Sequence, residues 1–187
     1  MSARSTPLAL AAALLLCASA RGAPAEPEVR ARVRGLLGAY RAVTVAEWRA
    51  LGPGAAPVLE AVAGDATALP TWRARALAAL GVLRPSAAAP LVRRLASDAG
   101  APPVLRSAAV DAAPGVLGAD AVEFLTPFLR DADSVVRQRS AEALAQSGPA
   151  GCRVVLAEAK AHPPAGALAR TAASCAEQLR TGAPPER

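Results

Sequence analysis

The stretch "LRDADSVVRQRSAEALAQSG", residues 129–148, carries the clearest pattern in this chain. Asp131 and Asp133 stand just ahead of Arg137 and Arg139, and a run of small apolar residues follows up to a glycine. Acidic residues are favourable where a helix begins, and glycine is common where one ends. The stretch therefore predicts a helix that begins next to a charged cluster, which is either a functional site or a structural contact.

The arginine of this cluster recurs along the chain. Arg73, Arg106, Arg137 and Arg170 stand at nearly equal intervals. The first three each follow an apolar or aromatic residue, and all four lie next to an Ala-rich run. The interval is about 30 residues, and a constant spacing of this length is typical of a chain built from repeated structural units.

The segments ahead of these arginines also match one another. Residues 55–65, 87–98 and 120–131 each end in aspartate and carry apolar residues at i and i+4, which share one face of a helix. The apolar pairs are Val58 and Val62, Leu91 and Leu95, and Leu125 and Leu129. Each unit is thus predicted to be a helix, a turn and a second helix, with a fourth copy beginning in residues 150–160.

Several residues mark the expected ends of these helices. Thr44 with Glu47, and Asp120 with Glu123, have the spacing of a capping box at a helix start. Pro114 is expected to end the helix that begins near residue 103.

Composition supports an all-α fold. Alanine, the strongest helix former, occurs 51 times, isoleucine is absent, and aromatic residues make up only 3%. Paired helices at a fixed period predict an α-solenoid of about four stacked helix hairpins.

The chain resembles the HEAT repeat family, and in particular the short HEAT-like repeats also found in phycobilin lyases. The resemblance rests on "FLRDADSVVRQRSAEALAQSG" and "RARALAALG", and it extends over about residues 44–180. It implies a HEAT-like superhelix. The first unit is degenerate, and the last fits the pattern one residue out of step, as is usual for the ends of a solenoid.

The resemblance also implies a role for the Asp–Arg cluster. In such proteins an aspartate that ends one helix and an arginine early in the next form a ladder between stacked repeats. The ladder residues here are Asp65 and Arg73, Asp98 and Arg106, and Asp131 and Arg137. Arginine offers five donors to carboxylates and to turn carbonyls of the adjacent repeat. A cluster that recurs at a nearly constant spacing in three of the units indicates a structural contact.

The N-terminus predicts a signal peptide over residues 1–20. Arg4 precedes the apolar residues 8–18, and small residues at 18 and 20 suit cleavage after Ala20. A Pro-rich leader at 21–28, a repeat domain at 29–180 and a disordered tail at 181–187 complete the expected organisation. We therefore expect a periplasmic or secreted bacterial protein with no membrane span after cleavage. Cys17 leaves lipid anchoring as an alternative, although Leu16 before it departs from a lipobox.

The net charge of +6 does not point to nucleic acid. The arginines are interspersed with acidic residues, and few aromatic side chains are available to stack on bases. We expect the charges to lie on solvated helix faces and no nucleic acid to be bound.

No motif for catalysis or cofactor binding is present. The sequence lacks a phosphate-binding glycine loop and a serine nucleophile motif. Cys152, His162 and Cys175 do not have the spacing of metal ligands. We expect neither cofactor nor metal.

Two classes of function remain. The favoured one is a non-enzymatic, monomeric scaffold that binds an unidentified protein partner through its helical surface. The alternative is an enzyme similar to the phycobilin lyases or to the HEAT-like DNA glycosylases, whose substrates are intracellular.

Phe124 and Phe128 are the candidate anchors for a partner. They lie at i and i+4, outside the repeated core positions, in a chain that has few aromatic residues. We expect them to form an interaction patch with Arg93, Arg94 and Arg130 around them. The alternative is that both rings fill gaps between alanines in the core.

Cys152 and Cys175 are expected to form a disulfide. They are the two cysteines after the signal peptide, and an exported compartment favours such bonds. They lie at nearly equal distances before and after Pro163, so an antiparallel helix hairpin would place them side by side. Two buried thiols are the alternative.

Overall fold

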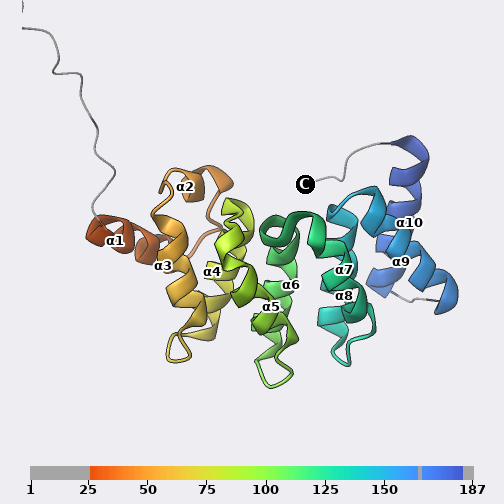
Figure 1. Cartoon of the computed structure of the whole chain (residues 1–187), viewed down its shortest axis with the longest axis horizontal. Helices are drawn as coiled ribbons and strands as arrows, with labels where there is room; N and C mark the ends of the chain where they lie inside the picture. The colour runs from red at the N-terminus through yellow and green to blue at the C-terminus, as the bar shows by residue number, and fades with distance from the viewer. Residues whose placement is uncertain (1–25, 164–165, 183–187) are drawn as a thin grey trace, which may run out of the picture.

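The computed structural model describes residues 26–163 and 166–182, and this part of the chain is all-helical, without strands (Figure 1). The predicted all-α class is confirmed. The helices are α1 (Glu26–Leu37), α2 (Val45–Arg49), α3 (Ala55–Gly64), α4 (Pro70–Leu83), α5 (Ala89–Ser97), α6 (Pro103–Leu117), α7 (Ala121–Leu125), α8 (Ser134–Gln146), α9 (Pro149–Ala161) and α10 (Gly166–Thr181). The predicted signal peptide and most of the predicted leader and tail lie outside the described residues.

Local sequence explains where the helices begin. Prolines stand in the first turns of α4, α6 and α9, where a missing N–H costs no helical hydrogen bond. The capping box of α2 is formed as predicted, with Thr44 Oγ1 accepting from the Glu47 N–H and Glu47 accepting from the Thr44 N–H. The predicted box at Asp120 is not formed. Asp120 has helical backbone angles within a 3-10 turn, and its carboxylate lies near Arg93 instead.

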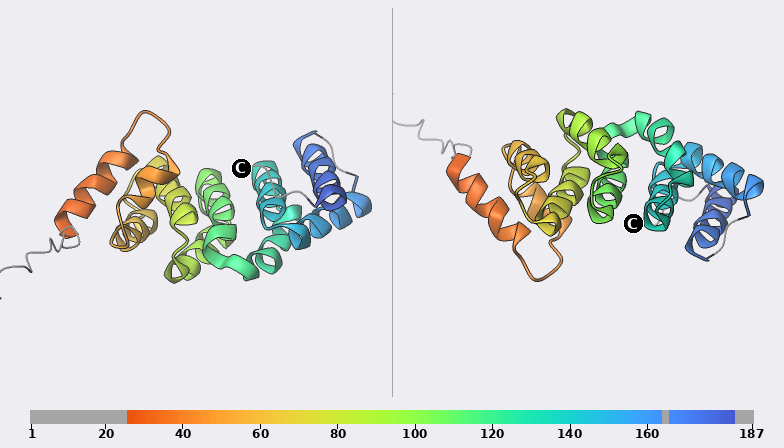
Figure 2. Two further views of the ribbon diagram at one scale, coloured as in Figure 1. Left: turned by 90° about the horizontal axis from the view of Figure 1, so that it is seen from above. Right: turned by 90° about the horizontal axis from the view of Figure 1, so that it is seen from below.

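The helices follow one another in chain order along the long axis of the molecule (Figure 1). Within each pair, α3 packs on α4, α5 on α6 and α9 on α10. The second helices also pack in series, α4 on α6, α6 on α8 and α8 on α10. Seen from above and below, α5, α7 and α9 lie on one side of a curved row, and α6, α8 and α10 lie on the other (Figure 2).

The core is one contiguous apolar cluster that reaches from α1 to α10. Its largest fully buried side chains are leucines and valines from α1, α3, α4, α5, α6, α7 and α8, and alanines fill the spaces between them. Of the predicted core pairs, Leu125 and Leu129 are both buried, and so are Val58 and Leu95, whereas Val62 and Leu91 are only partly buried. Leu59 and Val92 are fully buried as well, so the inward faces of α3 and α5 include residues next to the predicted pairs.

Glycines allow two pairs of helices to approach closely. A Cβ on Gly115 in α6 would overlap the carbonyl oxygen of Gly81 in α4. A Cβ on Gly151 in α9 would overlap the carbonyl oxygen of Leu144 in α8. Neither position leaves room for any other residue, because these backbones are in direct contact.

Three predicted boundaries differ from the structure. The helix α6 continues through Pro114 to Leu117, because Gly115 packs on Gly81 and the next two residues are buried. Residues 120–131 form the short helix α7 and a 3-10 turn at Thr126–Arg130, since Pro127 cannot donate a helical hydrogen bond. The helix α1 begins at Glu26, inside the predicted leader, with acidic residues at its favourable N-terminal end.

Candidate functional site

The three ladder aspartates have the same local role. Each begins a turn by accepting a hydrogen bond on Oδ1 from the N–H two residues later. Asp65 accepts from Thr67 at 2.8 Å, Asp98 from Gly100 at 2.9 Å and Asp131 from Asp133 at 2.9 Å. This is the Asx-turn geometry that favours aspartate after a helix.

The three ladder arginines also share a role, which is to bind carbonyl oxygens near the end of the preceding helix. Arg73 Nε donates to Ala63 O at 3.0 Å, and Arg106 Nε donates to Ala96 O at 3.3 Å. Arg137 Nη1 donates to Asp131 O at 2.7 Å. These carbonyls belong to the same helix pair as the arginine, whereas carbonyls of the adjacent repeat were predicted.

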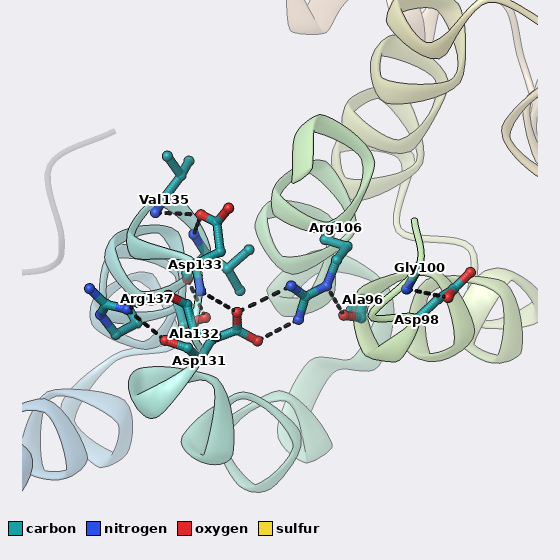
Figure 3. A network of polar contacts seen from close by, with 11 residues as sticks. Ala96, Asp98, Gly100, Arg106, Asp131, Ala132, Asp133, Val135 and Arg137 are labelled. Carbon is teal, nitrogen blue, oxygen red and sulfur yellow. Dashed lines mark hydrogen bonds and ion pairs between the residues drawn. The ribbon is translucent and has the colours of Figure 1, made fainter. Parts of the chain in front are cut away.

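One arginine also reaches a carboxylate in the next helix pair (Figure 3). Arg106 in α6 forms a bidentate ion pair with Asp131. Its Nη1 donates to Oδ1 at 3.1 Å, and its Nη2 donates to Oδ2. Both side chains are only 12% exposed. Hydrogen bonds from Arg106, and to a lesser degree from the Asp133 N–H, lower the pKa of the Asp131 carboxyl group, and burial opposes this effect.

The equivalent pair one unit earlier is not formed. Arg73 and Asp98 have the same separation along the chain as Arg106 and Asp131, but no ion pair joins them in the described part of the chain. The Asp–Arg positions thus recur as turn and helix-end contacts, and the cross-connection is specific to the α6–α8 junction. In the stretch 129–148, Asp131, Asp133 and Arg137 make turn and helix-end contacts. Asp131 also pairs with Arg106.

The phenylalanine pair lies elsewhere, with Phe124 on α7 and Phe128 on the 3-10 turn that follows it. Phe124 and Phe128 are half-buried, and their ring centroids are 5.2 Å apart with the planes inclined at 61°. This edge-to-face arrangement is a favourable one for aromatic rings. Both rings pack against the core without belonging to it.

The two rings line a surface hollow of about 550 Å³, here named the phenylalanine hollow. Its lining consists of Arg93, Ser97, Asp120, Glu123, Phe124, Pro127 and Phe128. Pro127 also lines the hollow, and the two phenylalanines lie on α7 and on the 3-10 turn that follows it.

The charges of the hollow differ from those expected. Arg93 lies over the Phe124 ring, with its guanidinium carbon 5.0 Å from the ring centroid, and its Nη2 is 3.5 Å from Asp120 Oδ2. Glu123 is exposed, and its carboxylate makes no hydrogen bond or ion pair with the other described residues. The lining therefore holds two carboxylates and one guanidinium.

Two of the predicted flanking arginines are not in the hollow. Arg94 is exposed on α5 but does not line the hollow. Arg130 donates from Nε and Nη2 to the Glu158 carboxylate of α9, at 2.9 and 3.0 Å. The aromatic anchors and Arg93 were predicted together, whereas Asp120 and Glu123 were missed, although both stand shortly before Phe124 in the sequence.

The predicted disulfide is present. Cys152 in α9 and Cys175 in α10 are joined, with their Cα atoms 5.0 Å apart, and both residues are fully buried. His162 lies away from them and faces Glu158, with 3.1 Å between Nδ1 and Oε1. Within residues 26–163 and 166–182 no three His, Cys, Asp or Glu side chains are arranged to hold a metal ion.

Comparison with known proteins adds no relative to this description. No family model matches the chain, and no curated protein is found to be similar to it. Among the helices that the structure describes, none combines the length and apolarity needed to cross a membrane.

Proposed function

We propose that this protein is an exported, non-enzymatic scaffold, built as a solenoid of HEAT-like repeats, that binds a protein partner at the phenylalanine hollow. The observation that carries the proposal is the pair of half-buried phenylalanines in a concave lining, outside the apolar core. Aromatic side chains in such positions are common anchors of protein interfaces.

The series of packed second helices supports the solenoid. The helices α4, α6, α8 and α10 contact one another in chain order, and the aspartate turns recur at equal intervals. In a solenoid each unit contacts only its neighbours, and stacking buries the apolar face that a single unit leaves open. The polar outer face of α10, with Glu177 and Arg180, suits a terminal unit.

The disulfide and the N-terminal sequence support export. A buried disulfide persists in an oxidising compartment. Residues 1–20 have the order of charge, apolar run and small residues that a signal peptidase recognises. Expression of the full chain in a bacterium followed by mass measurement tests this: we expect a periplasmic protein that begins at Arg21, and a chain retaining residue 1 in the cytoplasm contradicts export.

Site-specific crosslinking tests the binding site. A photo-reactive amino acid replaces Ser97, which is exposed and lines the hollow, and in a matched control it replaces Arg32 on α1. In envelope extract we expect one discrete crosslinked product from position 97 and none from position 32. The product should be lost in a Phe124→Ala, Phe128→Ala variant whose melting temperature shows that it is folded. Retention of the product in that folded variant rules out the hollow as the site.

A further inference from the structure

The chemistry of the partner follows from the charges of the phenylalanine hollow, and this inference rests on the proposed function. In the hollow, one guanidinium group, that of Arg93, contacts both an aromatic ring and a carboxylate. Arg93 lies 5.0 Å above the Phe124 ring, and Asp120 is 3.5 Å from its Nη2 atom. A cation over a ring face is attracted by the ring quadrupole, and a carboxylate beside it balances the charge.

The hollow also contains a second aromatic ring, that of Phe128, and a second carboxylate, that of Glu123, but among residues 26–163 and 166–182 no cation accompanies them. Phe128 lines the hollow, and no guanidinium or ammonium group of the described residues lies over its ring. Glu123 lines the same hollow and is exposed, and its carboxylate has no ion pair or hydrogen bond within the described part of the chain. Arg94 and Arg130, the other two arginines predicted to flank the phenylalanines, do not line the hollow, and Arg130 is held by Glu158.

The charge count agrees with this arrangement. The lining holds Asp120 and Glu123 against Arg93, so the hollow has one negative charge in excess, whereas the whole chain has a net charge of +6. Opposite charge at an interface selects the partner and speeds the encounter. We propose that the hollow receives an arginine side chain of the partner, which lies against Phe128 and pairs with Glu123.

The two phenylalanines give a direct way to observe this event. They are the only two in the chain, so incorporation of 4-fluorophenylalanine yields two fluorine NMR signals. Phe124→Leu and Phe128→Leu each remove one signal and thereby assign both. The probe is N-acetyl-arginine amide, and the matched neutral probe is N-acetyl-citrulline amide, which has the same shape without the charge.

We expect the arginine probe to shift the Phe128 signal in a saturable way and the citrulline probe to leave it nearly unchanged. Glu123→Gln should weaken binding of the arginine probe about two- to five-fold, as expected for an exposed ion pair. Glu28→Gln removes an exposed acid from α1, far along the chain, and should have no effect. The inference is overturned if neither signal responds, if both probes act alike, or if N-acetyl-glutamate amide binds more tightly.

The partner itself separates this inference from the proposed function. If the crosslinked product from position 97 disappears in the double alanine variant but persists fully in Glu123→Lys, the hollow binds a partner and the arginine assignment is wrong. If the product persists in both variants, the proposed function is wrong as well. Loss in both variants, together with the probe titration, supports both statements.

Discussion

The α4–α6 and α6–α8 junctions occupy equivalent places in the chain and are held together differently. At the first, the backbones meet at Gly81 and Gly115, where a Cβ on Gly115 would overlap the Gly81 carbonyl oxygen. At the second, Arg106 and Asp131 form an ion pair between side chains that are 12% exposed. The equivalent residues of the first junction, Arg73 and Asp98, are not paired.

The difference shows that residues repeated along the chain can keep their contacts within a helix pair while their contacts between helix pairs vary. All three ladder aspartates make the same Asx turn, and all three arginines bind carbonyls at the end of the preceding helix. The turn contacts depend on residues within one helix pair. The ion pair depends on how two neighbouring helix pairs are placed relative to each other. It occurs at Asp131, where the loop to the next helix is shorter than the loop after Asp98.

The largest effect is expected from adding a side chain at the close contact between Gly115 and Gly81. Gly115→Ala should destabilise the fold by about 3 kcal/mol, because α4 and α6 would have to separate to admit the methyl group. Urea unfolding followed by circular dichroism measures this change. Gly35→Ala is the control: this position is exposed, a Cβ there would meet nothing within 4 Å, and alanine should stabilise α1 by about 0.5–1 kcal/mol. Similar values for the two variants would contradict the close contact.

A smaller effect is expected from removing the ion pair. Asp131→Asn keeps an oxygen that can accept from the Asp133 N–H but loses the charge that Arg106 binds. We expect a loss of about 2 kcal/mol, typical of a hydrogen-bonded pair that is largely shielded from water. Asp98→Asn is the matched substitution at the unpaired junction and should change stability by less than about 0.5 kcal/mol. Equal losses would show that the two junctions do not differ in this respect.

The same pair should make stability depend on acid. The pKa of Asp131 is lower in the folded chain because Arg106 donates to its carboxylate. The carboxylate therefore stabilises the fold above the unfolded pKa of about 4, and the contribution is lost as the pH falls through the lower folded value. The stability difference between the parent chain and Asp131→Asn should shrink from about pH 5 downwards, as measured by urea unfolding at each pH. A difference that is independent of pH would refute the assignment.

The smallest effect is expected at the end of α4, beyond both junctions. Arg84 caps α4 with φ of 57°, in the left-handed region that favours glycine. Arg84→Gly should stabilise the fold by about 0.5 kcal/mol, because relief of the backbone strain exceeds the added freedom of the unfolded chain. Thermal unfolding, with Arg84→Ala as the comparison, tests this, and a gain with alanine would point to loss of the arginine side chain as the cause.

Sequence periodicity predicted what lies within a helix pair better than what lies between pairs. The capping box at Thr44 and the disulfide depend on spacing along one or two adjacent helices, and both were found. The helix α6 was predicted to end at Pro114, and this prediction was wrong. The helix continues because Gly115 contacts a different helix, α4. No local pattern contains that information.

The candidate site shows the same limit. The sequence identified Phe124 and Phe128 as residues outside the core pattern, and the structure places them together with Arg93. Arg94 and Arg130 were also expected around the two phenylalanines, but neither lines the hollow. Arg130 lies against α9 instead, because it donates two hydrogen bonds to Glu158 of the next helix pair. That pairing depends on how the 3-10 turn sits against α9.

The disulfide between α9 and α10 has a consequence for limited proteolysis. Cys152 and Cys175 enclose the loop between these two helices in a covalent ring. A single protease cut anywhere from residue 153 to residue 174 therefore leaves both fragments attached, and only a reducing agent separates them. At the other end of the molecule, α1 is held by its buried residues and by hydrogen bonds from Arg75 to the carbonyl oxygens of Leu37 and Ala39. One cut in the loop after Leu37 therefore leaves α1 attached by noncovalent contacts alone.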